Sequence, residues 1–452
     1  MSRVLIVGTG PLPSPALRRV TFPQLRTRHF ARALAEAGHD VGLVCLRQPD
    51  DGPPSLPRGP LQHIWDLPTF RADWMDGLRS LAREHEPELW VSAGPYLPLH
   101  CAKLVRDLPY WADLPGDPFA EAQARADRLA PAQPSEPLPQ GPWQAHAAVA
   151  IAAMERADAF SVCSGPQHHA LLGQLGVLGR LALSLPDRPW AAVIPPAYDF
   201  DLPQGEPRSR APGSPLVVVL AGGFNTWLDE DTTLRGLLAA MDRGLPITVR
   251  VTGGAIPGHH SAGWQAFERG VAASPHAHRF ELHGWVPHGD LPATLAGAHL
   301  LLCVDRPGAE PVLGSRTRLI FGLHQGLALM ATTPGELERD LADRGYLTPL
   351  GEATPQALAD ALEAVVAAGC DGDRVSQAQT WLAHAHDPHH LAAPLLQWAQ
   401  TPGRAPQGSS GALEISAQLE ATRAELAGVY ATPTWRVLSS LHRLFLRLLG
   451  RH

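Results

Sequence analysis

Short apolar runs alternate with polar, helix-length segments along the first half of this chain. Residues 3–7 form an apolar run that ends in Gly8-Thr9-Gly10, a helical pattern covers residues 26–37, and residues 41–46 are apolar again. Such apolar runs are typical of strands buried on both faces of a parallel sheet, and the helical pattern between them is typical of a crossover connection. The opening residues therefore predict a β-α-β unit.

The same alternation continues toward residue 198, where it stops. A helix is predicted at residues 145–156, and residues 199–215 are rich in Pro, Gly, Ser and charge, as expected of a linker. We therefore expect a first α/β domain over residues 1–198. Its further predicted strands are residues 89–92, 109–113 and 159–164.

After the linker the pattern restarts, with a helix predicted at residues 230–241 and most apolar runs ending in glycine or polar residues. Two doubly wound α/β sheets are the simplest arrangement, with their glycine-rich carboxyl ends facing each other across a cleft. The second domain is expected over residues 216–400, with a linker and helical tail over residues 401–452. The strands predicted in it are residues 216–220, 247–252, 280–282, 300–304 and 327–331.

One corner of the second domain has the composition of an anion site. Gly314 and Ser315 precede a short helix that ends at Gly326, and Arg316 and Arg318 lie at its start. Free backbone N–H groups at a helix start favour an anion, and arginine forks match phosphate oxygens. The alternative is an ordinary helix start with two solvated arginines.

Two carboxylates in the first domain are candidates for catalysis. Asp113 ends a predicted strand, and Asp117 follows it beside Gly116. Open α/β sheets bind ligands at the carboxyl ends of their strands, so these acids are placed where a site is expected. A turn stabilised by aspartate side chains is the alternative. These acidic pairs have no cluster of His or Cys around them, and no metal site is predicted.

Composition narrows the class of protein. The 452 residues carry a net charge of -7, which argues against a general nucleic-acid binder. The five cysteines lie far apart and several are inside apolar runs, which favours a reduced, cytoplasmic protein. No apolar run reaches the roughly 18 residues of a membrane-spanning helix, and the chain begins with a strand pattern instead of a signal peptide.

The end of the chain predicts a basic amphipathic helix from Trp435 to His452. Its arginines have no acidic neighbour after Glu425, and its apolar residues share one face, a combination suited to an anionic membrane surface. A helix docked on the body or on a second subunit is the alternative. The apolar face consists of Leu438, Leu441, Leu444, Phe445, Leu448 and Leu449.

The order of several motifs over residues 3–398 resembles that of bacterial GT-B glycosyltransferases of the family-4 kind. The tail is similar to Ser-x-Ser-Trp-Arg tails of cell-surface polysaccharide glycosyltransferases, which implies an envelope glycan or lipid-linked acceptor. The motifs that carry the main resemblance are Asp113-Leu-Pro-Gly-Asp117, Val217-Val-Val-Leu-Ala-Gly-Gly, Phe280-Glu-Leu-His-Gly-Trp-Val-Pro and Ser315-Arg-Thr-Arg-Leu-Ile-Phe-Gly.

The resemblance implies transfer of a sugar from a nucleotide-diphosphate sugar, held by the second domain, to an acceptor held by the first. It implies retention of configuration without a protein nucleophile, and no cofactor beyond the nucleotide-sugar co-substrate. Asp113 or Asp117 would contact the transferred sugar or the acceptor hydroxyl, and Val286 would flank the base. The residues implied to surround the donor diphosphate are Gly8, Gly10, Gly222, Gly223, Asn225, Ser315, Arg316, Thr317 and Arg318.

The sequence also departs from the family pattern. Phe321 occupies the position of an acid that bonds the ribose, Ala328 replaces a proline, and residues 222–229 lack the usual Arg and Lys. A degenerate GT-B protein that binds a ligand or partner without turnover is therefore the alternative function. A sugar phosphorylase is a third.

Overall fold

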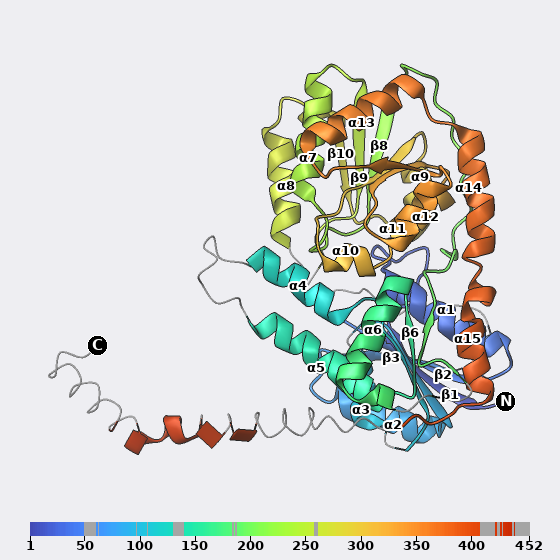
Figure 1. Ribbon diagram of the computed structural model, residues 1–452, viewed down its shortest axis with the longest axis vertical. Coiled ribbons are helices and arrows are strands. Elements are labelled where there is room, and N and C mark those ends of the chain that lie inside the picture. The colour runs from blue at the N-terminus through green and yellow to red at the C-terminus, as the bar shows by residue number, and fades with distance from the viewer. Residues whose placement is uncertain are drawn as a thin grey trace.

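Two α/β domains stack end to end in the computed structural model of the protein (Figure 1). Each contains one sheet whose paired strands are all parallel. The structure describes residues 1–48, 60–61, 63–95, 97–105, 107–129, 140–182, 185, 188–256 and 261–406, and in the tail residues 421–422, 425–426, 428–435 and 438.

The first domain has a seven-stranded sheet with the order β3-β2-β1-β4-β5-β6-β7. Alternate residues of β1 pack on opposite faces: Leu5 and Val7 with one cluster, Val4 and Ile6 with the other. Helices therefore cover both faces. The strands are β1 Arg3–Thr9, β2 Asp40–Arg47, β3 His63–Pro68, β4 Leu89–Ala93, β5 Tyr110–Asp113, β6 Ala159–Val162 and β7 Ala191–Val193, and the helices are α1 Phe22–Glu36, α2 Trp74–His85, α3 Leu97–Leu104, α4 Pro118–Leu129, α5 Gln140–Arg156 and α6 Gly165–Val177.

The second domain has a six-stranded sheet with the order β10-β9-β8-β11-β12-β13. In both sheets the order reverses beside the first strand of the domain, so the prediction of two doubly wound sheets is confirmed. The strands are β8 Leu216–Ala221, β9 Ile247–Thr252, β10 Phe280–Gly284, β11 Leu300–Cys303, β12 Ala328–Thr332 and β13 Leu347–Leu350, and the helices are α7 Glu230–Asp242, α8 Ser261–Ala273, α9 Leu291–Thr294, α10 Ala309–Leu313, α11 Thr317–His324, α12 Glu336–Asp343, α13 Pro355–Ala368, α14 Gly372–Ala385 and α15 Pro388–Gln400.

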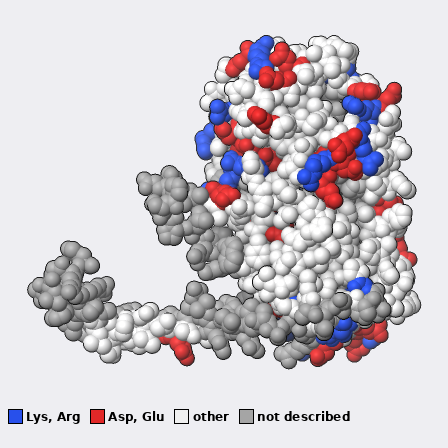
Figure 2. All heavy atoms as spheres, viewed as in Figure 1, with Lys and Arg blue, Asp and Glu red and all other residues white. Residues whose placement is uncertain are grey.

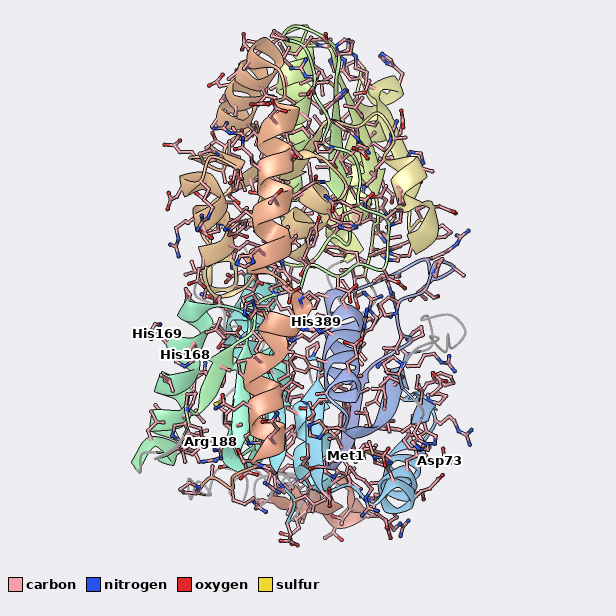
Figure 3. The ribbon with its side chains drawn as sticks, turned by 90° about the vertical axis from the view of Figure 1, so that its right-hand side faces the viewer. Met1, Asp73, His168, His169, Arg188 and His389 are labelled. Atoms are coloured by element: carbon pink, nitrogen blue, oxygen red, sulfur yellow. The ribbon has the colours of Figure 1, made fainter. Side chains whose placement is uncertain are left out.

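The chain returns to the first domain at its end. Helix α14 runs along the second domain, and α15 continues in the same direction over the first, with His389 near the junction (Figure 3). Trp398 of α15 is buried against Trp111 of β5, with ring centroids 5.5 Å apart. Beyond the helix, the Ala405 amide donates to Asp158 at 2.8 Å. Helix α15 was expected at the end of the second domain, and the structure places it in the core of the first domain.

Polar contacts hold the two domains in a fixed relation near α10. The Ser164 hydroxyl of the first domain donates to the Leu313 carbonyl at 2.5 Å, and the Gly165 amide donates to Glu336 at 2.8 Å. Helix α10 lies beside α4 and α6 at this boundary (Figure 1). The loops at the carboxyl ends of the two sheets are thereby set opposite each other.

The surface of the described residues carries mixed charge. On the face shown in Figure 2, acidic and basic side chains lie next to each other in patches separated by wide uncharged areas. This face has no continuous basic surface among its described atoms. None of the helices described is both long enough and apolar enough to cross a membrane.

Candidate functional site

A cavity of about 740 Å³ lies between the domains and is lined by loops from both sheets. This volume is within the range usual for small-molecule sites. Thr9 and Gly116 line it from the first domain, at the carboxyl ends of β1 and β5. The predicted donor-site residues that line it are Gly222, Gly223, Asn225, Val286, Ser315, Arg316, Thr317 and Arg318.

The loop after β8 lies close to the ends of two neighbouring strands. Gly222 has a φ of 87° and its amide donates to the Thr252 carbonyl at 2.7 Å. A Cβ atom at Gly223 would come within 2.2 Å of the Ile256 side chain. The positive φ favours glycine at position 222, and a side chain at position 223 would have to displace Ile256, so the loop presents bare backbone to the cavity.

Arg318 directs a positive charge toward this loop. It is half-buried on α11, and its Nη2 donates to the Gly223 carbonyl at 3.1 Å and to the Asn225 side chain at 3.4 Å. Arg318 forms no ion pair with any residue that the structure describes. Its guanidinium charge is therefore available to an anion in the cavity.

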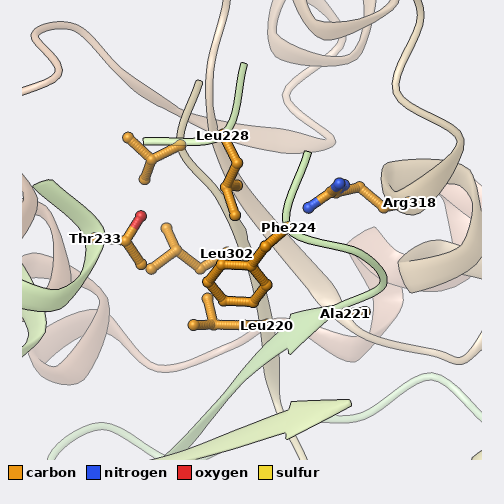
Figure 4. Close-up of a pocket in the computed structure, with 8 residues that line it drawn as sticks. Leu220, Ala221, Phe224, Leu228, Thr233, Leu302 and Arg318 are labelled. Atoms are coloured by element: carbon orange, nitrogen blue, oxygen red, sulfur yellow. The ribbon is translucent and has the colours of Figure 1, made fainter. Parts of the chain in front are cut away.

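Behind the guanidinium of Arg318 is a small apolar hollow, shown in Figure 4. Leu220, Phe224 and Leu302 line it, and its volume is about 10 Å³. A space of this size is at the lower limit for a single water molecule, and its walls are mostly apolar. The hollow is therefore part of the packing beneath the loop and does not extend the cavity.

Arg316 has a different role from the predicted one. Its side chain is only 4% exposed, and its Nε donates to Asp305 at 2.5 Å. Its two terminal nitrogens donate to the two oxygens of Glu310 at 2.7 and 3.1 Å. The expectation that this fork holds the diphosphate is corrected, because the fork is occupied by carboxylates of its own domain. Arg316 anchors the head of α11.

A third acid, Glu338, lies in the same buried cluster. It is 1% exposed, and neither carboxyl oxygen has a hydrogen-bond partner from another described residue. Burial raises the pKa of Glu338 to about 7, against the opposing charge of Arg316. Burial also raises the pKa of Glu310. Three acids face one arginine, and the raised pKa of Glu338 favours its neutral form, which reduces the excess negative charge in the core.

Asp113 does not line the cavity, and its predicted catalytic role is corrected. It is fully buried and paired with Arg26 of α1 at 2.8 Å, and it accepts a hydrogen bond from Ser161 at 2.6 Å. Arg26 also donates to the carbonyls of Ile194 and Pro195. This network joins α1 to the carboxyl ends of β5 to β7, and its buried acid has no access to a substrate.

Asp117 caps helix α4. One of its oxygens accepts from the amides of Phe119 and Ala120 at 3.0 and 2.8 Å, and the other accepts from Gln174 at 2.7 Å. Its side chain is 4% exposed and does not line the cavity. The predicted catalytic role is thus also corrected for Asp117, and the turn alternative holds.

Gly8 and Gly10 lie behind the cavity wall and do not line it. A Cβ atom at Gly8 would come within 2.1 Å of the Thr27 side chain, and one at Gly10 within 2.6 Å of Cys45. The expectation that they face the donor phosphates is corrected: both allow the end of β1 to pack closely on its neighbours.

The cavity also contains residues that the sequence analysis did not select. Arg18, Arg19 and Arg125 line its first-domain side. The available signal was the Arg-Arg pair in the loop that follows the first strand. Phe321, expected in place of a ribose-binding acid, lines the cavity and meets the ring of Phe200 edge-on, with centroids 5.6 Å apart.

Two doubly wound domains that face each other across a ligand-sized cleft define the GT-B fold. Sucrose-phosphate synthase from Thermosynechococcus elongatus has a TM-score of 0.60 and 16% identity, over 88% of this chain and 98% of that one. Anabaena HepE in complex with UDP-glucose has a TM-score of 0.57 and 14% identity, over 89% of this chain and 100% of that one. A Rickettsia africae glycosyltransferase has a TM-score of 0.50 and 11% identity, over 88% of this chain and 96% of that one.

These similarities to solved structures show the fold. The sequence itself matches no protein-family model and no curated protein sequence. The GT-B architecture expected from the motifs is therefore established by the structure, and the roles of the residues that line the cavity are a matter for proposal.

Asp113→Ala should destabilise the protein, because it leaves Arg26 as a buried charge without its partner. We expect the free energy of unfolding to fall by about 3–5 kcal/mol. Urea unfolding measures the change. The double variant Arg26→Met/Asp113→Leu should recover part of the loss, because it removes both charges. A stable Asp113→Ala protein that binds a donor but fails to turn it over would restore the catalytic role.

Glu338 should make stability depend on pH. Between its ordinary pKa of 4.5 and its folded pKa of about 7, the folded protein keeps a proton that the unfolded chain has lost. The free energy of unfolding should therefore fall as pH rises through this window. Its slope against pH should correspond to a difference of up to about one bound proton between the folded and unfolded states. Glu338→Gln should flatten the slope, measured by urea unfolding at several pH values.

The matched control for this experiment is Glu352→Gln, which alters an exposed glutamate of the same domain. It should keep the slope of the unaltered protein. If Glu338→Gln and the unaltered protein show the same slope, Glu338 is ionised in the folded state and the account of the cluster is wrong.

Proposed function

We propose that this protein is a glycosyltransferase that moves a sugar from a nucleotide-diphosphate sugar to an acceptor. The observation that carries the proposal is Arg318, an arginine without an ion-pair partner among the described residues, which lies beside the bare backbone of Gly223 in the interdomain cavity. A fixed cation and backbone N–H groups are what a diphosphate leaving group needs as its charge develops.

The second domain would hold the donor. Ser315 and Thr317 lie at the start of α11, where backbone N–H groups and the helix dipole favour an anion. Val286 and Trp285 line the same side of the cavity, and the Trp285 indole is fixed by a bond to the Ala255 carbonyl at 3.0 Å. This apolar pair suits a nucleobase, with the diphosphate toward Arg318.

The donor proposed is a UDP-sugar. The support comes from Anabaena HepE, a structure of the same fold whose complex contains UDP-glucose. We further propose that transfer is metal-independent, since Arg318 and the backbone can meet the charge of the leaving group. Among the described residues, no group of three or more His, Cys, Asp and Glu side chains could hold a metal ion.

The acceptor proposed is an envelope glycan or a lipid-linked glycan, with retention of anomeric configuration. Both follow from the family resemblance. The finding that Asp113 and Asp117 are occupied in structural networks fits a reaction without either as nucleophile. The anomeric configuration of the product, read by NMR, tests retention.

Phe321 favours the alternative of a binding protein without turnover. An acid that could bond the ribose hydroxyls is replaced by an aromatic ring, which packs on Phe200 at the cavity wall. The two functions differ in one measurement. Incubation with a panel of nucleotide sugars and detection of products by mass spectrometry gives transfer or hydrolysis for an enzyme, and only ligand binding for a binder.

Arg318→Ala should weaken binding of UDP, because it removes the charge-assisted hydrogen bonds to the diphosphate. Such bonds contribute about 1.5–3 kcal/mol, so we expect a loss of roughly 10- to 100-fold in affinity, measured by isothermal titration calorimetry. Arg318→Lys should keep part of the affinity, since it retains the charge but not the fork.

The control variant is Arg243→Ala, which removes a surface arginine of the same domain that pairs with Asp360 and Glu363. It should bind UDP as the unaltered protein does. Equal affinities for Arg318→Ala and the unaltered protein, with both folded, would place the nucleotide elsewhere and remove the basis of the proposal.

We also propose that the tail rests on an anionic membrane surface. The predicted helix from Trp435 to His452 lies almost entirely outside the described residues. Of its described members, Trp435 and Leu438 are 42% and 55% exposed, so their apolar side chains face solvent. This exposure supports a surface contact with lipid.

Deletion of residues 432–452 should abolish flotation with vesicles that contain phosphatidylglycerol. The full chain should float with these vesicles, and less so with neutral phosphatidylcholine vesicles or at high salt, because the attraction is partly electrostatic. If the shortened and full chains float equally, the tail does not bind the membrane.

A further inference from the structure

The first-domain wall of the interdomain cavity is basic. Arg18, Arg19 and Arg125 line it together with one acid, Glu121, which leaves a surplus of positive charge on this wall. The chain as a whole has a net charge of -7. The basic wall is therefore a local feature of the cavity and does not follow from composition.

The loop that carries Arg18 is held in place by the second domain. The residue before it, Leu17, is buried, and its carbonyl accepts from the His288 amide at 2.8 Å. The Pro15 carbonyl accepts from the Gly289 amide at the same distance. These two bonds fix the β1–α1 loop at the domain boundary. Arg18 is exposed and has no ion-pair partner among the described residues.

Arg125 is positioned by a contact on the same helix. Arg128, one turn further along α4, donates to both oxygens of Glu230 at 2.7 Å and to the Leu228 carbonyl at 2.6 Å, all in the second domain. Residues three apart share a helix face, so Arg125 is directed to the same boundary. It is half-buried, lines the cavity and has no ion-pair partner among the described residues.

The topology makes this wall a binding position in its own right. The strand order of the first sheet reverses between β1 and β4, and the β1–α1 loop that carries Arg18 begins at that switch point. Open α/β sheets bind ligands there. Because the donor would be held by the loops of the second domain, the first-domain wall faces the other substrate.

We propose that the acceptor carries a phosphoryl group and that Arg18 and Arg125 bind it on the first-domain side of the cavity. The inference rests on the proposed function, because it takes the second-domain wall as the donor site. Guanidinium groups suit phosphate oxygens because they offer forked donors and a permanent charge. A small sugar phosphate and the phosphate head group of a lipid-linked acceptor share this chemistry.

The test is calorimetric titration of the full-length protein saturated with UDP. The probes are a hexose 6-phosphate, a short polyprenyl phosphate in detergent, the uncharged hexose and a hexuronate. We expect a phosphorylated probe to bind at least about tenfold more tightly than the uncharged hexose, as a charge-assisted contact implies. Tight binding of the hexose phosphate identifies a small acceptor, and tight binding only of the polyprenyl phosphate identifies a lipid-linked one.

The variants assign the binding to the two arginines. Arg18→Gln/Arg125→Gln should lose roughly tenfold or more in affinity for the phosphorylated probe, with the affinity for UDP unchanged. The control Arg83→Gln removes an exposed arginine of the first domain and should bind as the unaltered protein does. If the double variant does not fold, the two single variants are compared instead.

Several results would overturn the inference. Equal binding of charged and uncharged probes removes the phosphoryl site, and tighter binding of the hexuronate makes the acceptor a carboxylate. A fall in UDP affinity in the double variant assigns the arginines to the donor. Failure of the unaltered protein to bind UDP contradicts the proposed function alone, since the titration with phosphorylated probes is repeated without UDP and still decides whether the basic wall binds them.

Discussion

The site depends on the ion pairs that Arg316 makes with Asp305 and Glu310. Asp305 follows β11, Glu310 belongs to α10, and Arg316 lies at the head of α11, so one guanidinium ties three consecutive segments together. The Asp305 amide itself donates to the hydroxyl of Thr332, the last residue of β12. This network fixes the start of α11, and with it the direction in which Arg318 leaves the helix.

The relation between the domains is determined by elements that cross the boundary. The linker after Tyr198 and the α14–α15 junction run next to each other, and the Tyr198 amide donates to the His386 carbonyl at 2.8 Å. The two covalent crossings therefore lie side by side, and polar contacts are added by Arg128, which bonds the Leu228 carbonyl, and by Ser164, which bonds the Leu313 carbonyl of α10. The relation between the domains is therefore set both by the covalent connections and by polar side-chain contacts between the two domains.

The central strands could be predicted from the sequence because each is a continuous apolar run buried on both faces. The edge strands β3 and β13 could not. They contain Pro68 and Pro349; the other residues of β3 are half-buried or exposed, and β13 has only four residues, so the apolar signal is weak. Proline is tolerated at a sheet edge because one side has no partner strand. A sequence pattern thus detects strands that are buried on both faces, and it misses edge strands that are short or only half-buried.

Of the residues predicted for the site, those of the second domain line the interdomain cavity, and Gly8, Gly10, Asp113 and Asp117 of the first domain do not. Strand ends indicate where polar residues gather, but they do not say which of them face the cavity. The partner of Asp113 is Arg26, which lies 87 positions away, and no local spacing reveals that pair. Arg316 is the N-cap residue of α11 and Arg318 lies in its first turn, so the two side chains leave the backbone in different directions and find different partners. Arg316 points into its own domain, and Arg318 lies at the cavity.

The buried Arg316 helps Arg318 to present a positive charge to the cavity. With three ionised acids around Arg316, the cluster would be negative and would cancel the charge of Arg318, which is close enough to lower the pKa of Glu310. Burial raises the pKa of both Glu310 and Glu338, which opposes the build-up of negative charge beside Arg318. A diphosphate bound beside Arg318 would add negative charge and favour the protonated acids further. The buried proton and the bound anion would then stabilise each other, which connects the folding of the second domain to the charge of the ligand that it holds.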